Sequence, residues 1–228
     1  MNINNAQVNV SIVVYSSQEE IHSLKYQILK NSIIYLENNK FINKLLIIDN
    51  SPKNYFSWTK RIGKKVNYVF NSKNLGFGRG HNLSKVYLED KKFHLILNPD
   101  IIFDENKDLI EELIYYFKLD EKNVILQPNI VNYQNEKNQF LCKRNPTLLI
   151  QIIRGFSPHF IKKLFEKYNH FYEMRDIAYK NKVVESQYLS GCFLLCKTEA
   201  LNKVKWFDED FFMYMEDADL VRRLSAIG

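Results

Sequence analysis

The chain has 228 residues, of which 46% are hydrophobic and 25% are charged, with a formal net charge of +6. Seven glycines and five prolines are too few for a disordered or loop-rich chain, so the composition indicates a sizeable core in one large domain. The basic residues are spread along the sequence, which argues against a dedicated nucleic-acid-binding role, and Cys142, Cys192 and Cys196 lack a zinc-binding spacing.

The first 130 residues alternate between apolar runs and stretches of helical periodicity. A β-branched run at 8–15 predicts a strand buried on both faces, and apolar residues at three- and four-residue spacing then predict a helix within 19–39. Four further strands are predicted at 44–52, 66–72, 93–101 and 124–131, and one further helix is predicted at 106–119. This alternation is typical of an α/β fold with a mostly parallel sheet flanked by helices.

Polar side chains stand where three of these strands end. Tyr15 closes the first strand, Asp49 and Asn50 close the second, and Asp100 follows the apolar run "FHLIL". Parallel sheets of this class bind ligands beyond the carboxyl ends of their strands. These residues are therefore expected to face one ligand crevice.

A glycine-rich stretch, "NLGFGRGHN", leads from the third strand into a helix. Its spacing fails the dinucleotide pattern G-x-G-x-x-G, it does not follow the first strand, and no Walker A lysine is present. Gly76 and its neighbours still permit close approach of the backbone to a ligand, and Arg79 at a helix start favours an anion.

Two acidic groups are candidates for chemistry. Asp100, in Asn98-Pro99-Asp100, offers oxygen to a hard cation such as Mg²⁺ or Mn²⁺, although a turn with an Asx-type hydrogen bond is an equal alternative. Glu216, Asp217 and Asp219 follow the apolar segment "FFMYM", which we expect to be buried. They suit either general-base catalysis or a solvated helix N-terminus, with Asp217 pointing inward and its neighbours capping the helix.

The alternation breaks between residues 146 and 180, where the sequence is basic and aromatic. A stripe from Phe160 to Tyr172 is expected on one helical face, with Lys162, Lys163 and Lys167 beside it. One interpretation is a helix packed on the domain, and the other is an interfacial element that contacts anionic lipid.

A strand and a helix start near Thr198 are expected next, followed by a final amphipathic helix. The five histidines show no catalytic or metal-binding spacing and are interpreted as structural or surface residues.

Six segments in this order resemble family 2 glycosyltransferases, in particular their rhamnosyltransferase-like branch. They run from about residue 8 to residue 228 and read "SIVVYSS", "LLIIDNSP", "NLGFGRGHN", "LILNPDI", "LSGCFLL" and "FDEDFFMYMEDADLVRRL". The resemblance implies a GT-A fold, a nucleotide-diphosphate sugar donor and an inverting transfer. Asn98-Pro99-Asp100 is similar to the family's metal-binding DXD element, with Asn98 at its first acid and Asp100 as ligand of Mn²⁺ or Mg²⁺.

The resemblance also implies roles for the other residues. Asp217 matches the family's catalytic base, with Glu216 beside it, and Gly191 would let the backbone approach the donor sugar. The remaining donor-binding candidates are the residues at strand ends and in the glycine-rich segment: Tyr15, Asp49, Asn50, Asn74, Gly76, Arg79, Asn82 and Asn98. Relatives usually continue past the last helix with a strand and a histidine, so the chain is expected to be either truncated there or a short natural form.

The resulting hypothesis is a single GT-A domain over 1–228, with a nucleotide-sugar-binding half at 1–132 and an acceptor-side half at 133–228. It would transfer a sugar from dTDP-rhamnose or a UDP-hexose to a saccharide or lipid-linked saccharide in bacterial surface polysaccharide synthesis. We expect a cytoplasmic location, at the inner face of the cell membrane or in peripheral contact with anionic lipid, and no nucleic-acid partner. The alternatives are a catalytically impaired nucleotide-sugar-binding module and a sugar nucleotidyltransferase, which usually carries a basic glycine-rich signature that the N-terminus lacks.

Overall fold

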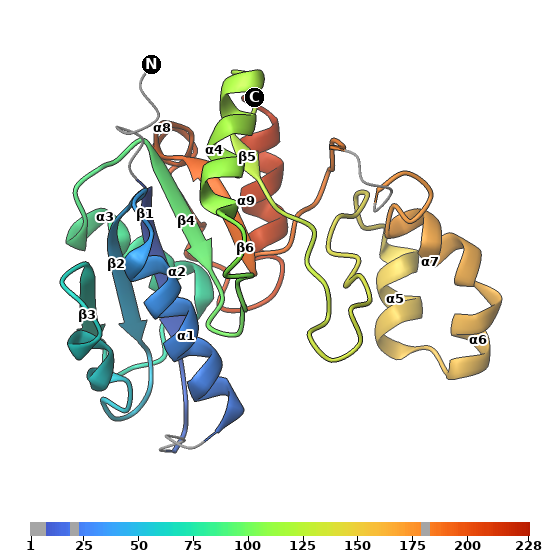
Figure 1. The fold of residues 1–228 in the computed structure, drawn as a ribbon. Helices are drawn as coiled ribbons and strands as arrows, with labels where there is room; N and C mark the ends of the chain where they lie inside the picture. The colour runs from blue at the N-terminus through green and yellow to red at the C-terminus, as the bar shows by residue number, and fades with distance from the viewer. Residues whose placement is uncertain (1–7, 19–22, 179–182) are drawn as a thin grey trace. The chain divides into compact units, whose positions relative to one another are not determined.

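The computed structural model describes residues 8–18, 23–178 and 183–228 (Figure 1). The chain forms two compact units, one of residues 1–127 with 191–228 and the other of residues 128–190. We call them the sheet unit and the helical unit. The expected division of labour between residues 1–132 and 133–228 concerns function and stays a prediction.

The sheet unit is built on a six-stranded sheet within the described residues, in the order β3-β2-β1-β4-β6-β5. Its strands are β1 (Val8–Val14), β2 (Ile42–Asp49), β3 (Val66–Phe70), β4 (Phe93–Leu97), β5 (Ile125–Leu126) and β6 (Phe193–Lys197). The pairs β1–β2, β2–β3 and β1–β4 are parallel, and β6 runs antiparallel to both β4 and β5. The expected α/β fold with a mostly parallel sheet is confirmed.

The central strands form because they are apolar on both faces. All five residues of β4 are buried, and β2 is fully buried from Leu45 to Asp49. Such runs satisfy their backbone groups in the sheet while both faces pack under helices. The fifth strand is shorter than expected, since Pro128 lacks the N–H group that would extend its pairing.

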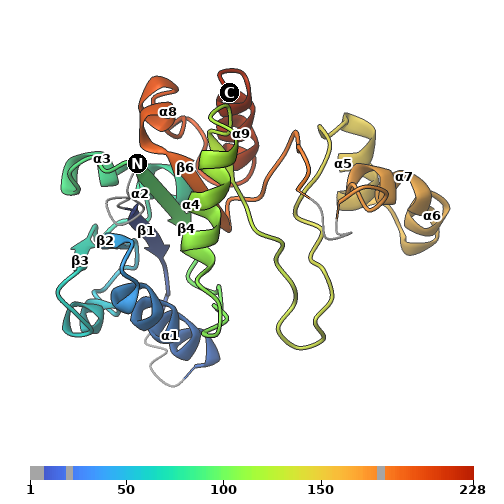
Figure 2. The ribbon, with the colours of Figure 1, turned by 45° about the horizontal axis from the view of Figure 1, so that its top comes forward.

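Two long helices lie on the same side of this sheet, α1 (Leu24–Asn38) and α4 (Leu109–Leu119) (Figures 1 and 2). Side chains cap both N-termini, because Ser23 accepts a hydrogen bond from the Tyr26 amide and Asp108 accepts one from the Glu111 amide. The Asp108 cap explains why α4 begins later than the predicted residue 106. The other helical segments of this unit are η2 (Ser57–Arg61), α2 (Phe77–Asn82), α3 (Ser84–Tyr87), α8 (Thr198–Lys203) and α9 (Glu216–Ser225).

The helical unit contains α5 (Leu148–Phe156), α6 (His159–Leu164) and α7 (Glu166–Tyr172). The predicted continuous stripe from Phe160 to Tyr172 is wrong, because the helix is interrupted at Phe165, whose backbone (φ −96°, ψ 17°) leaves the helical region. Tyr168 and Tyr172 turn toward α5, where the Tyr168 hydroxyl lies 2.8 Å from Thr147 Oγ1 and the Tyr172 ring faces the Arg154 guanidinium. Tertiary contacts thus divide the stripe into an inward half and an exposed half.

Candidate active site

The sheet register brings the polar strand ends to one edge. Val14 pairs with Asp49, and Ile12 pairs with Leu97, so Tyr15, Asn50 and Asn98 follow at neighbouring positions. The order of the strands also changes direction here, because β1 continues to β2 on one side and lies beside β4 on the other. This is the switch point at which open α/β sheets form a ligand crevice.

The side chain of Asp49 is buried and accepts three hydrogen bonds. The donors are the Tyr68 hydroxyl at 2.7 Å, the Ser51 amide at 2.9 Å and the Phe56 amide at 3.3 Å. Burial and the hydrogen bond with Asp49 both raise the pKa of Tyr68. Asp49 therefore holds the loop after β2, whereas Tyr15 is exposed at the end of β1 and presents its ring to solvent.

Asn50 connects the end of β2 to the glycine-rich turn. Its Nδ2 donates to the Gly76 carbonyl at 3.0 Å, and its Oδ1 accepts from Asn71 at 2.8 Å. Asn74 accepts a hydrogen bond from the Gly76 amide, and Gly76 itself has a φ of +80°. A Cβ at Gly76 would collide with the carbonyl oxygen of Phe212, so glycine is required both by the backbone conformation and by this close approach.

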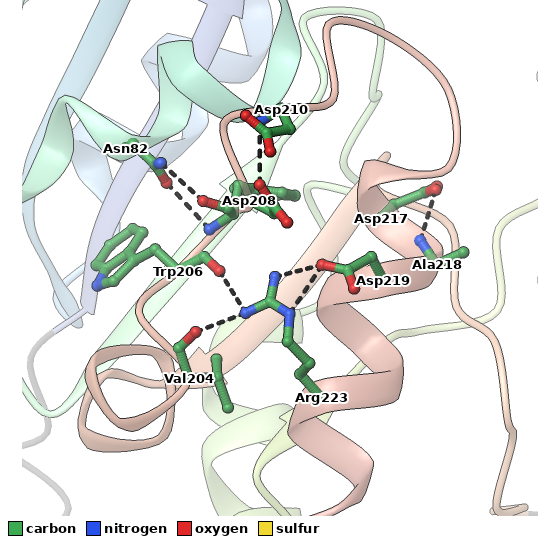
Figure 3. Close-up of polar contacts among 10 residues, drawn as sticks. Asn82, Val204, Trp206, Asp208, Asp210, Asp217, Ala218, Asp219 and Arg223 are labelled. Atoms are coloured by element: carbon green, nitrogen blue, oxygen red, sulfur yellow. Dashed lines mark hydrogen bonds and ion pairs between the residues drawn. The ribbon is translucent and has the colours of Figure 1, made fainter.

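Arg79 and Asn82, on α2, hold the segment before α9. Arg79 Nε donates to the Glu209 carbonyl at 2.6 Å. Asn82 donates to the Phe207 carbonyl and to Glu209 Oε1, and it accepts from the Phe207 amide at 3.1 Å. Figure 3 shows the Asn82 side chain directed at this segment. Both residues were predicted to contact the donor, and that role stays a prediction beside the structural one.

The two acidic groups are linked through the start of β6. Since β6 runs antiparallel to β4, the residues at its start lie beside Asn98, whose amide donates to the Cys192 carbonyl at 2.8 Å. The adjacent Gly191 amide donates to Asp217 Oδ2 at 2.9 Å. A Cβ on Gly191 would press against Phe77 and the Asp217 side chain. One short segment therefore positions both Asn98-Pro99-Asp100 and Asp217.

The first turn of α9 gives its three acidic residues different surroundings. Asp217 Oδ1 accepts from the Ala218 amide at 2.8 Å, while Asp219 pairs with Arg223 at 2.6 Å instead of capping the helix. Arg223 also donates to the carbonyls of Val204 and Trp206, which ties the helix to the loop before it (Figure 3). Sequence reasoning missed Arg223, whose i+4 spacing from Asp219 was the available signal.

Glu216 is the buried carboxylate of this turn, with 6% of its surface exposed. Its Oε2 has no hydrogen-bond partner in the part of the chain that the structure describes. Burial raises the pKa of Glu216, and the neighbouring charge of Asp217 raises it further. A carboxyl with a raised pKa beside a second carboxylate is common at functional sites.

The segment "FFMYM" is exposed, contrary to our expectation that it is buried. Phe212, Met213, Tyr214 and Met215 all present large surfaces to solvent. Tyr214 and Met215 have φ values of 70° and 71°, so the backbone turns through two left-handed residues before α9 begins. Core contacts are made by Trp206, Phe207 and the buried face of α9 instead.

A buried polar network that sequence reasoning missed lies under α2. The Ser11 hydroxyl is 2.7 Å from His81 Nδ1 and 2.8 Å from His94 Nε2. Burial lowers the pKa of His94 to about 3 and lowers that of His81 as well, so both imidazoles are neutral. The predicted structural role of these histidines fits their burial, and no spacing in the sequence signals the contact.

Asp100 is the candidate metal ligand. Its carboxylate is exposed and forms no hydrogen bond or ion pair with any residue that the structure describes. Residues 8–18, 23–178 and 183–228 contain no group of three or more His, Cys, Asp or Glu side chains able to hold a metal. The donor set therefore fits a cation that takes one carboxylate from the protein and its other oxygens from a diphosphate or water.

No model of a known protein family matches the chain. In sequence it is 26% identical to the rhamnosyltransferase WbbL of Escherichia coli K12, across 67% of this chain and 55% of that protein. In structure it matches GalNAc-T7 with UDP, GalNAc and Mn²⁺ (TM-score 0.64, 12% identity, 96% of this chain, 40% of that one).

Two further structures match across nearly the whole chain. They are S. aureus TarS 1–349 (TM-score 0.55, 13% identity, 97% of this chain, 56% of that one) and the mannosyltransferase PcManGT of Pyrobaculum calidifontis with GDP-Man and Mn²⁺ (TM-score 0.55, 12% identity, 94% and 50%). The chain has the GT-A glycosyltransferase fold. The chain spans between 40% and 56% of the length of the proteins that it matches here.

Proposed function

We propose that the chain is a glycosyltransferase that moves a sugar from a nucleotide-diphosphate donor to a saccharide acceptor with inversion at the anomeric carbon. The observation that carries this proposal is the link through Gly191 and Cys192. It connects the Asp217 carboxylate to the Asn98-Pro99-Asp100 segment at the switch point of the sheet. The similarity to WbbL and the GT-A fold support transfer of a sugar from a nucleotide-sugar donor.

In this proposal Asp217 is the general base. Direct displacement needs a group that takes the proton from the acceptor hydroxyl while that oxygen attacks the anomeric carbon and the diphosphate departs. Two backbone amides, those of Gly191 and Ala218, hold the Asp217 carboxylate in one orientation. Asp219 and Arg223 keep the first turn of α9 in place, so the base rests on a rigid element.

Glu216 supports Asp217 electrostatically. A buried carboxyl with a raised pKa holds its proton at higher pH than an exposed one, which reduces repulsion between the two neighbours. Glu216 then limits the negative charge beside Asp217 and does not itself need to reach the acceptor. Because Glu216 and Asp217 differ in burial, the proposal gives these two adjacent acids different roles.

Asp100, with Asn98 beside it, is the group that would hold Mn²⁺ or Mg²⁺. When bound, the cation supplies positive charge that stabilises the departing diphosphate. GalNAc-T7 and PcManGT, which share the fold, were solved with Mn²⁺. The donor surface would further include Tyr15, the Asn74–Gly76 turn and Gly191, with Asp49, Asn50, Arg79 and Asn82 shaping it through the contacts described above.

The donor in this proposal is dTDP-rhamnose or a UDP-hexose, and the acceptor is a lipid-linked or free saccharide of bacterial surface polysaccharide synthesis. The similarity to a rhamnosyltransferase supports the first donor. Placement in family 2, and a cytoplasmic location at the inner face of the cell membrane, belong to the same proposal.

A transfer assay with dTDP-rhamnose, UDP-glucose and Mn²⁺ tests the function. Asp217→Asn preserves the size and the amide contacts of the side chain but cannot accept a proton, so turnover falls by about 10²- to 10⁴-fold with donor affinity nearly unchanged. Asp210→Asn, an exposed change in the preceding loop, is the matched control and retains turnover. Full activity of Asp217→Asn contradicts the assignment, and nucleotide binding without any transfer by the wild type indicates a donor-binding module.

A further inference from the structure

The helix α5, which Figure 1 shows in the helical unit, carries exposed apolar side chains along one side. Leu148, Leu149, Ile152 and Phe156 are all exposed, and Phe156 has 89% of its surface accessible. Positions 148, 152 and 156 recur at four-residue spacing with 149 beside them, so they lie on one face of the helix. Four large apolar side chains on one helical face are more than a monomeric surface usually presents.

The remaining contacts of α5 fix the direction of this face. Ile150 and Ile153 are buried within the helical unit. Arg154 donates to Asn169 and to the buried Glu173, both at 2.6 Å. Because Arg154 contacts α7 and its C-terminal end, and Ile150 and Ile153 lie on the same side of α5 as Arg154, the exposed face of Leu148, Ile152 and Phe156 lies on the other side of the helix.

The next helix extends the apolar surface and adds charge to it. After Ser157 and Pro158, α6 exposes Phe160 and Leu164, which are four residues apart, and between them Lys162 and Lys163. Neither lysine forms an ion pair with any part of the chain that the structure describes. We call the six apolar residues of the two helices, with these two lysines, the α5–α6 surface.

The sequence around this surface has an unusual charge distribution. From residue 137 to residue 165 it contains six lysines and arginines and no aspartate or glutamate. Arg144 and Arg154 of this stretch are paired with Asp176 and Glu173, and Lys162 and Lys163 carry positive charge beside the exposed apolar face. Interfacial helices that lie in the headgroup region of anionic membranes combine these two features.

We propose that the α5–α6 surface binds the interface of an anionic lipid bilayer. The apolar side chains enter the boundary between headgroups and acyl chains, while Lys162 and Lys163 remain at the level of the anionic headgroups. The element lies on the membrane. No helix among residues 8–18, 23–178 and 183–228 is long and apolar enough to span a bilayer.

Charge favours a lipid surface over a second copy of the chain. If two copies met through the same face, each would bring Lys162 and Lys163 and no acidic residue from this stretch, so like charges would oppose each other. Anionic headgroups neutralise the same lysines. The proposal differs from the predicted stripe, since it uses α5 and α6 and leaves Phe165, Tyr168 and Tyr172 in contact with the unit.

Co-sedimentation of the full chain with vesicles tests this surface. Vesicles of phosphatidylcholine with 30% phosphatidylglycerol, about a third anionic lipid, should retain the wild type, and release should increase with salt. Lys162→Gln with Lys163→Gln removes two charges and lowers the partition coefficient about thirtyfold, since each basic residue near an anionic surface is worth about fivefold. Phe156→Ser with Phe160→Ser abolishes retention because it removes the two exposed aromatic rings at the turn between the helices.

The matched control uses apolar side chains that are equally exposed elsewhere. Val86 is 76% exposed and Tyr133 is 74% exposed, so Val86→Ser with Tyr133→Ser removes similar surface outside the α5–α6 surface and leaves retention unchanged. All variants change exposed residues, and far-UV circular dichroism checks that each is folded. Equal loss in the control would show unspecific hydrophobic adsorption and overturn the proposal.

A fluorescent reporter then locates the contact. Phe156→Trp places an indole in the α5–α6 surface, and its emission should shift to the blue and be quenched by brominated acyl chains. Tyr133→Trp, the matched reporter, should show neither effect. Absence of both effects at position 156 contradicts insertion of the surface.

A concentration-dependent dimer that Phe156→Ser disrupts, without vesicle retention, would identify a second copy as the occupant. None of these readouts depends on sugar transfer, so their failure leaves the proposed function untouched.

Discussion

Among the residues that the structure describes, each compact unit buries one glutamate, and the two glutamates have opposite surroundings. Glu173 of the helical unit and Glu216 of the sheet unit are both 6% exposed. Glu173 accepts hydrogen bonds from Arg154 at 2.6 Å and from Arg175 at 2.7 Å. Glu216 has an oxygen without a partner among the residues described.

The pKa values of these glutamates follow their partners. Burial alone would raise the pKa of Glu173, but the hydrogen bonds and charges of the two arginines hold it below its usual value. Burial raises the pKa of Glu216, and Asp217 adds to the effect. The helical unit therefore uses its buried carboxylate for stability, whereas the sheet unit keeps one at a cost in stability beside the proposed base.

The two units should differ most in how much a leucine contributes to stability, because one leucine is buried in the sheet unit and the other is exposed in the helical unit. Leu97, the last residue of β4, is fully buried, and Leu97→Ala should lower the free energy of unfolding by about 2–5 kcal/mol. Leu164→Ala, the same change on the exposed face of α6, should alter it by less than about 0.5 kcal/mol. Urea denaturation followed by circular dichroism measures both. Similar losses in the two variants would mean that the α5–α6 surface is covered in solution.

A substitution at Glu173 removes its ion pairs with Arg154 and Arg175 in the helical unit. Glu173→Gln removes the charge between two arginines and should destabilise the unit by about 2 kcal/mol at pH 7, a value reduced because both arginines are partly exposed. A carboxylate whose folded pKa is lowered stabilises above its unfolded pKa, and this contribution is lost as pH falls through the folded pKa. The variant and the wild type should therefore converge in acid. Hydrogen exchange of α7 amides from pH 7 to pH 3 would show whether they do.

At Glu216 we expect the stability of the folded state to change with pH in the direction opposite to that at Glu173. A carboxyl whose folded pKa is raised favours the folded state below its unfolded pKa, near 4.5, and loses that contribution as pH rises through the folded pKa. Glu216→Gln removes the ionisable group, and with it the loss of stability at high pH, and should raise the melting temperature slightly at pH 7.5. The gain should vanish near pH 4. A melting temperature lowered at pH 7.5 would show that Glu216 has a stabilising partner in the folded protein.

The sequence predicts the parts of this fold that depend on local patterns. The apolar runs before Asp49 and Asn98 are strands because their residues must be buried on both faces, and α1 and α4 form within the predicted ranges 19–39 and 106–119. Thr198 begins α8 as expected. The sequence order of six short segments was sufficient to indicate the GT-A fold.

The other features depend on contacts between distant residues. Asn82 holds Phe207, Ser11 joins His81 to His94, and no spacing encodes either contact. "FFMYM" has the composition of a core segment, but Gly76 and Asn82 place it over the glycine-rich turn with its side chains outward. The roles of Asp217, Asp100 and the donor-binding residues stay predictions, because they concern a complex that the chain alone does not contain.

Calorimetric titration of the chain with UDP and dTDP, with and without Mn²⁺, tests the central claim most directly. If Asp100 holds a cation that bridges to the diphosphate, Mn²⁺ should tighten binding by at least about tenfold, the equivalent of one charge-assisted contact. Asp100→Ala should remove that dependence, whereas Asp104→Ala, an exposed carboxylate in the same loop that pairs with Lys107, should retain it. Equal dependence on Mn²⁺ in Asp100→Ala and the wild type, or no nucleotide binding by the wild type, would contradict the account.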